Sequence, residues 1–135
     1  MRVVDTNVVA YLLMAGGQSA AARQLHDRDP DWRSEAFLLV EFTNVLAFSV
    51  TAKRMTASQA TDSLVTATAL FAGRLAHVSH ALVLETALRY RVTAYDARFL
   101  ALAQQLDSRL ITEDAKLRAA APELTQALTE ALATA

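Results

Sequence analysis

Short apolar segments alternate with helical stretches along the chain, and this alternation constrains the fold more than any other feature of the sequence. Segments 2–5, 75–78 and 109–112 suit short strands, 92–95 forms a further short segment, and 27–31 suits a loop. Helical stretches cover 18–28, 35–54, 56–72, 80–90, 96–106 and a short run from 114. This pattern predicts a parallel sheet with helices on both faces. The 135 residues contain no repeat or linker, so we expect one α/β domain over residues 1–135.

Acidic residues follow several of these segments. Asp5 ends the first strand, Asp96 lies just past segment 92–95, and Asp114 lies two residues beyond Thr112, the end of the last strand. Ligands of an open parallel sheet sit at the carboxyl ends of its strands, so these three acids are expected at one edge. Each has a structural alternative, because Asp96 and Asp114 suit helix N-caps and Asp5 suits a turn.

A fourth acid, Glu41, lies inside a predicted helix that is apolar nearly all round and is therefore expected to be buried. Its helical neighbours are Phe37, Leu38, Val45 and Phe48. A charged carboxylate in such surroundings must be paired or must bind a metal, because burying it alone is very costly. The sequence leaves both interpretations open, an ion pair with an arginine or a metal ligand.

Converging carboxylates indicate a hard divalent cation. Mg²⁺ and Mn²⁺ prefer carboxylate and water oxygens, and such ions activate water and stabilise the leaving oxygen in phosphodiester hydrolysis. The net charge of −1 disfavours binding nucleic acid by charge alone, whereas bound metal would bring a phosphate to an acidic pocket. Without metal the carboxylates repel one another, so at least one pKa should rise. The absence of cysteine excludes disulfides, thiolate metal sites and cysteine nucleophiles.

Four short motifs, in this order and spacing, carry a resemblance to a known family. They are VVDTN at 3–7, Glu41 with NVL at 44–46, AYDA at 94–97, and LITEDAKL at 110–117. Together they resemble the PIN-domain family over residues 3–117, and in size the chain is similar to the VapC-type toxins of bacterial toxin–antitoxin pairs.

The resemblance implies a three-layer α/β/α fold with a central parallel sheet and an endoribonuclease that depends on Mg²⁺ or Mn²⁺. The acidic quartet of the family falls on Asp5, Glu41, Asp96 and Asp114. Asp5 and Asp96 are the strongest metal-ligand candidates. Thr112 falls on the strand-end hydroxyl of the family, which would orient water or phosphate, and Thr6 and Asn7 are weaker candidates.

The resemblance also implies partners. They are an RNA substrate, a small antitoxin protein that would block the acidic pocket with an arginine or lysine, and a second copy of the chain in a homodimer. We expect no membrane association. We expect a cytoplasmic location, because Asp5 stands where a signal peptide would need an apolar run.

Two features depart from the motif pattern. Glu113 is an additional acid beside Asp114, and it is either an exposed residue or a further metal ligand. The C-terminal tail, residues 122–135, begins at Pro122 and has Leu124, Leu128 and Leu132 at helical spacing. It is expected either to cover the core or to form a seam with another chain.

Three other classes of protein remain as alternatives. A receiver-like signalling domain needs a phospho-acceptor aspartate on a middle strand and a lysine on a late one, whereas Lys116 lies past the last strand. A phosphatase of the haloacid-dehalogenase type needs a second acid where Asn7 stands. A catalytically inactive PIN-like binding module would have no reason to keep Glu41 in an apolar helix.

Overall fold

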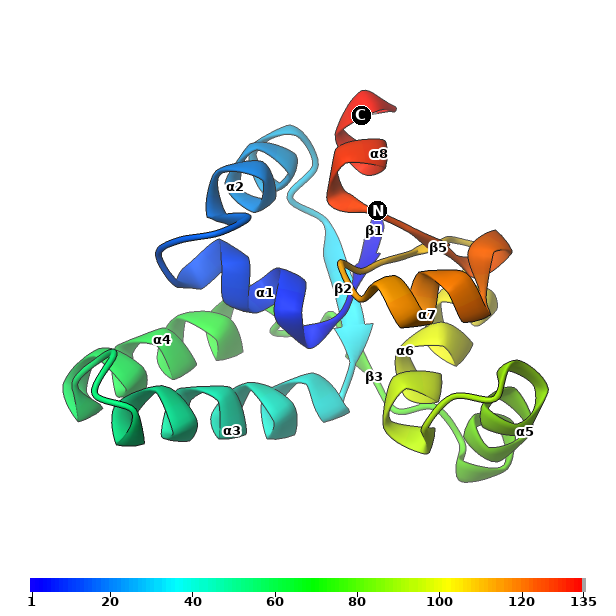
Figure 1. Ribbon diagram of the computed structural model, residues 1–135, viewed down its shortest axis with the longest axis horizontal. Helices are drawn as coiled ribbons and strands as arrows, with labels where there is room; N and C mark the ends of the chain where they lie inside the picture. Colours follow the sequence, from blue (N-terminus) through cyan, green and yellow to red (C-terminus); the bar gives the residue numbers. More distant parts are fainter. Residues whose placement is uncertain (135) are drawn as a thin grey trace.

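The computed structural model describes residues 1–134, in which five short strands form one parallel sheet (Figure 1). In spatial order they are β3 (Leu75–Ala76), β2 (Trp32–Glu35), β1 (Arg2–Val4), β4 (Leu110–Ile111) and β5 (Thr125–Gln126). Every neighbouring pair is parallel. Val3, Val4, Leu110 and Ile111 in the two central strands are fully buried, which agrees with helices covering both faces.

The helices form a layer on each side of the sheet. Their bounds are α1 (Thr6–Leu13), α2 (Ser19–Arg28), α3 (Phe37–Thr51), α4 (Ala57–Leu70), α5 (His80–Tyr90), α6 (Ala94–Gln105), α7 (Ala115–Ala120), the 3₁₀ helix η1 (Pro122–Leu124) and α8 (Leu128–Ala133). Helices α1 to α4 lie on one side of β1 and β2, and α5 to α7 lie on the other (Figure 1). The predicted three-layer α/β/α architecture with a central parallel sheet is confirmed.

Strand β2 was not predicted: it occupies residues between the expected loop at 27–31 and the expected helix start at 35. Its sequence is largely polar, yet Ser34 and Glu35 are fully buried because each polar group has a partner. The Ser34 hydroxyl donates to the carbonyl of Val4 at 2.7 Å, and the Glu35 carboxylate accepts the backbone N–H of Phe37 at 2.6 Å. Pairing with β1 and β3 therefore determines this strand, and apolar periodicity does not reveal it.

Helix α3 is shorter and less buried than its apolar sequence predicts. It covers Phe37–Thr51 instead of 35–54, and it buries one face against α1 and α4. Val40 and Phe48 on the other face are 60% and 61% exposed. The expectation of a helix buried all round was wrong, because only one of its faces meets the core. Within residues 1–134, no helix combines the length and apolarity needed to cross a membrane.

Helix α6 begins two residues before the predicted start at Asp96. Thr93 is its N-cap, and its hydroxyl accepts the backbone N–H of Asp96 at 3.1 Å. The structural alternative for Asp96, helix capping, is therefore wrong, and its carboxylate is available for other contacts. Asp114, in contrast, is the N-cap of α7, as predicted.

The C-terminal tail belongs to the fold as far as residue 134. Strand β5 pairs with β4, and α8 packs against α2, with Leu128 and Ala131 fully buried. Arg28 of α2 donates to the carbonyl of Leu132 at 3.0 Å. Of the two expectations for the tail, covering the core is the one that the structure supports.

Candidate active site

The strand order places a crevice beside β1. The chain runs outward from β1 to β3 and then returns to add β4 and β5 on the other side of β1. In open parallel sheets such a reversal leaves a crevice at the carboxyl ends of the strands, where ligands bind. Asp5 follows β1, and Thr112 follows β4. The register pairs Val4 with Ile111, so the next residues, Asp5 and Thr112, stand at the same level beside the crevice.

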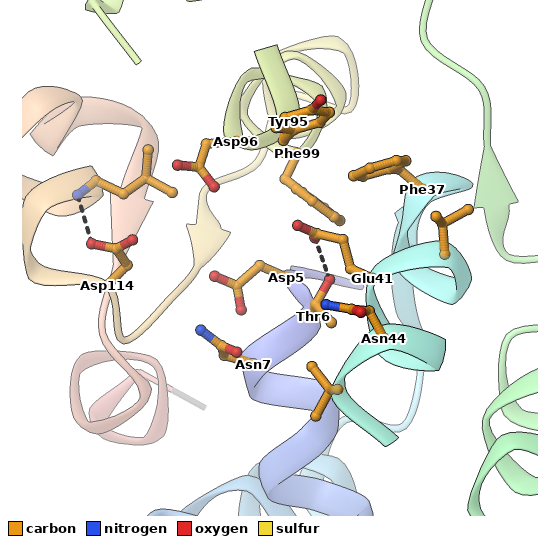
Figure 2. A pocket seen from close by; sticks show the side chains of 13 residues that line it. Asp5, Thr6, Asn7, Phe37, Glu41, Asn44, Tyr95, Asp96, Phe99 and Asp114 are labelled. Atoms are coloured by element: carbon orange, nitrogen blue, oxygen red, sulfur yellow. Dashed lines mark hydrogen bonds between the residues drawn. The ribbon is translucent and has the colours of Figure 1, made fainter. Parts of the chain in front are cut away.

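A pocket of about 530 Å³ occupies this position. The structure brings all four predicted carboxylates to it, from the starts of α1 and α7, from α6 and from the side of α3 (Figure 2). Thr6 and Asn7, the weaker candidates, line it as well. Of the described residues that line the pocket, none is basic; they are Asp5, Thr6, Asn7, Phe37, Val40, Glu41, Asn44, Val45, Tyr95, Asp96, Phe99, Asp114 and Leu117.

Asp5 is the most buried of the four acids, with 8% of its surface exposed. It is the N-cap of α1, and its Oδ1 accepts the backbone N–H of Val8 at 3.1 Å. Burial raises its pKa to about 6, and the nearby charges of Asp96 and Glu41 add to this rise. Hydrogen bonds from the Thr112 hydroxyl and the Val8 N–H act in the opposite direction. A cation in the pocket would therefore stabilise the ionised form of Asp5.

Glu41 reaches the pocket from α3 and is half-buried, so the predicted full burial is wrong. Its Oε1 accepts the hydroxyl of Thr6 at 2.7 Å, a contact between α3 and the start of α1 (Figure 2). No arginine within residues 1–134 forms an ion pair with it. Burial raises its pKa, the Thr6 hydroxyl lowers it, and the charge of Asp96 raises it further.

Asp96 and Asp114 face the pocket from the side opposite Glu41 (Figure 2). Oδ1 of Asp114 accepts the backbone N–H groups of Lys116 and Leu117 at 2.9 and 3.1 Å, which fixes the side chain at the start of α7. Burial raises the pKa of Asp96, and the charge of Asp114 raises it further. The two carboxylates are therefore close enough to repel each other.

Thr112 is fully buried behind Asp5 and does not line the pocket. Its Oγ1 accepts the backbone N–H of Asp114 at 3.1 Å, so its hydroxyl hydrogen remains for the Asp5 carboxylate. In this structure its hydroxyl connects two of the acids rather than facing a ligand directly.

Glu113 turns away from the pocket. Its carboxylate forms an ion pair with Arg118 at 3.4 Å and accepts the backbone N–H of Leu128, which ties α7 to α8. Of the two interpretations of Glu113, a metal ligand is not supported, because its contacts are structural.

Within residues 1–134, no neighbouring side chain balances the negative charge of the pocket. The ion pairs within residues 1–134 involve Asp29, Asp31, Glu35 and Glu113, and none of them includes a pocket acid. In the same part of the chain, no three acidic or histidine side chains converge closely enough to hold one ion on their own. The four carboxylates therefore line one pocket without forming a closed cage.

Aromatic residues of the pocket were missed by sequence reasoning. Phe37 and Tyr95 stack at 5.4 Å with an interplanar angle of 11°, and Phe99 lies beside them (Figure 2). Phe99 also belongs to the core, with 2% of its surface exposed. The position of Tyr95 immediately before Asp96 was the only available signal.

Comparison with known proteins agrees with this geometry. A model of the PIN domain family matches residues 2–122, which is most of the chain. The chain belongs to the PIN-domain family. PIN domains are typically nucleases, and PIN nucleases usually use divalent metals. The pocket of this PIN domain lies where the acids of the four motifs meet.

A solved structure shows the same fold. The crystal structure of PAE2754 from Pyrobaculum aerophilum superposes on this PIN domain with a TM-score of 0.75. The alignment covers 98% of this chain and 94% of that chain, with 18% sequence identity. Among curated proteins, none matches the sequence.

Proposed function

We propose that this PIN domain is an endoribonuclease that depends on Mg²⁺ or Mn²⁺ and acts as the toxin of a VapC-type toxin–antitoxin pair. The observation that supports the nuclease most is the pocket itself. It gathers Asp5, Glu41, Asp96 and Asp114, and the described residues that line it include no basic side chain. Such a pocket repels a phosphodiester unless a cation enters with it.

The donor set fits a hard divalent cation. Its oxygens are the ligands that Mg²⁺ and Mn²⁺ prefer, and burial together with mutual repulsion makes the ionised carboxylates receptive to positive charge. Because no three of the side chains converge, we expect one or two direct carboxylate ligands, with water completing the shell, as is usual for Mg²⁺. Asp5 and Asp96 are the proposed direct ligands, and Glu41 and Asp114 complete the acidic site.

A bound divalent ion supplies activation of water and stabilisation of the leaving oxygen in phosphodiester hydrolysis. The side chains of this protein supply position. Val8 and Thr112 orient Asp5, Thr6 orients Glu41, and the start of α7 orients Asp114. A site held by several backbone and hydroxyl groups keeps its geometry through turnover.

The test is RNA cleavage by purified protein in Mg²⁺, Mn²⁺ or EDTA. Asp96→Asn should lower kcat/KM at least roughly 100-fold, because it removes a charge that holds the ion. Asp62→Asn is the matched control, since Asp62 is an exposed acid on α4, remote from the pocket. Equal cleavage in EDTA or by the Asp96 variant would contradict the proposal. No cleavage by a folded protein that binds no metal would favour an inactive binding module.

The proposed toxin role is tested in cells. Induced expression of the wild type should arrest bacterial growth, whereas the Asp96→Asn protein at equal abundance should not. A small antitoxin is the proposed partner, its arginine or lysine entering the acidic pocket. Neutralising Asp5 and Asp96 together should then weaken antitoxin binding. Unchanged binding would contradict this mode of inhibition and leave the nuclease proposal intact.

A homodimer is the proposed assembly. Light scattering on the purified protein should give twice the mass of one chain. A monomeric mass would contradict the dimer without affecting the acidic site.

A further inference from the structure

The pocket has two chemically different sides. Asp5, Asp96 and Asp114 lie on one side, and the rings of Phe37, Tyr95 and Phe99 gather on the other (Figure 2). A nucleotide has the same division, with a charged phosphate and a flat aromatic base. A pocket of about 530 Å³ is in the range that holds small ligands, roughly 300–1,000 Å³.

We propose that Tyr95, stacked on Phe37, is the platform on which the pocket binds one unpaired nucleobase of a single-stranded RNA. This inference rests on the proposed nuclease function and names the substrate class of the same site. Single-stranded RNA is the form whose bases can leave their stack and rest on an aromatic side chain.

The ring of Tyr95 is accessible on the side that a base would use. The residue is 60% exposed although it lines the pocket, and Phe37 covers one face of its ring at a centroid distance of 5.4 Å. This exposure leaves part of the ring, which Phe37 does not cover, available to a base. An exposed tyrosine alone requires no explanation, but this one stands directly before Asp96 in the wall of the acidic pocket.

Phe37, the ring on which Tyr95 stacks, is held in place before any ligand arrives. The backbone N–H of Phe37 donates to Oε1 of the buried Glu35 at 2.6 Å. The guanidinium of Arg98 lies 5.6 Å from the centroid of the Phe37 ring and donates to Oε2 of Glu35 at 3.3 Å. A base that stacks here does not have to order the Phe37 ring first, so less affinity is lost to side-chain entropy.

Asn44 offers a further polar group in the pocket, about two turns of α3 beyond Phe37 and past Glu41 (Figure 2). It lies on α3 in the lining of the pocket, and no hydrogen bond of its side chain occurs within residues 1–134. Asparagine amides pair with the edges of bases, so Asn44 is available to a nucleotide next to the one that stacks on Tyr95.

The test measures binding separately from cleavage. The wild-type protein serves as the background, because its acids must hold the ion, and it is mixed in Mg²⁺ with short single-stranded RNAs that carry 2-aminopurine at successive positions, with fluorescence followed before cleavage. Stacking quenches the fluorescence of this base, so one position should be quenched on binding. Tyr95→Leu in the same background should abolish the quenching and weaken binding roughly 5- to 150-fold, the effect of losing one base stack.

Two ring-retaining variants complete the test. Tyr95→Phe and Tyr95→Trp should keep both the quenching and the affinity, because they preserve an aromatic face. Equal binding and quenching by Tyr95→Leu would overturn the platform. A change of oligomeric state in Tyr95→Leu, with RNA binding unaltered, would overturn it in favour of a protein contact.

The failure of this inference differs from the failure of the nuclease proposal. If wild type and Tyr95→Leu cleave RNA with equal kcat/KM, the platform is wrong and the nuclease stands. If RNA binds and quenches but is not cleaved by the wild type, the nuclease proposal fails and the platform stands.

Discussion

Two carboxylates at the same edge of the sheet have opposite surroundings. Glu35 ends β2 and Asp5 follows β1, and the register of these strands places them at the same level. Glu35 is fully buried, accepts the backbone N–H groups of Phe37 and Val78, and pairs with Arg98 at 3.3 Å. Asp5 has no cation within the described residues and faces Asp96 and Glu41 instead.

The difference separates a structural acid from a candidate functional one. Both carboxylates are removed from water, which is costly for a charge. For Glu35 the protein supplies the positive partner, and the pair ties β2 to α6, the helix that carries Asp96. For Asp5 the compensation has to come from outside the chain. Burial alone therefore does not mark a site, whereas burial without a cationic partner does.

The largest expected effect comes from breaking the internal pair. Arg98→Met leaves Glu35 buried and unpaired, and the free energy of unfolding should fall by about 3–5 kcal/mol. Urea denaturation followed by circular dichroism measures it. The double variant Glu35→Gln with Arg98→Met removes both charges and should recover much of the loss. A single variant as stable as the wild type would show that Glu35 needs no cation, which would remove the contrast with Asp5.

The next effect has the opposite sign and depends on pH. The pKa of Asp5 is about 6 in the folded protein, against 3.8 for an ordinary aspartate, so the folded state retains this proton more strongly. Protonated Asp5 stabilises the folded protein. This contribution is fully present below about pH 4 and is lost as the pH rises to about 6. The loss amounts to about 3 kcal/mol in metal-free protein.

Asp5→Asn should remove this loss. In EDTA the variant should unfold at a higher urea concentration than the wild type at pH 7, and the two should agree near pH 4. Saturating Mg²⁺ should narrow the difference at pH 7, because it stabilises only the protein that binds it. Asp62→Asn serves as the control for removing an exposed acid. A variant less stable than the wild type at pH 7 in EDTA would contradict the interpretation of Asp5 as an uncompensated charge.

The sequence alone indicates the position of Asp5 but does not indicate the buried pair of Glu35 and Arg98. The positions of Asp5 and Asp114 follow from local patterns, since each comes just after an apolar strand and parallel strands end at one edge. Glu35 pairs with a residue 63 positions away, and its strand is polar and short, so no periodicity indicates it. Periodicity does not indicate strand β5 either, because it has only two residues and depends on pairing with β4.

The aromatic side of the pocket is equally beyond the sequence. Phe37 is the first residue of α3 and Tyr95 is the second of α6, and these two helices meet only in the folded protein. Glu41 was expected to be fully buried because helical periodicity counts apolar neighbours and does not show which face of α3 is covered.

The smallest expected effect tests how Glu41 is held. The Thr6 hydroxyl donates to its Oε1 at 2.7 Å and lowers its pKa, so it favours the ionised form. Thr6→Val keeps the shape of the side chain and removes the donor, which should cost about 1 kcal/mol of stability, less than the usual value for a bond to a charged group because Glu41 is only half-buried. Thr6→Ser retains the hydroxyl and should lose less. If valine and serine were equally stable, the bond would be worth no more than one to water, and Glu41, unlike Glu35, would be held by the packing of α3 alone.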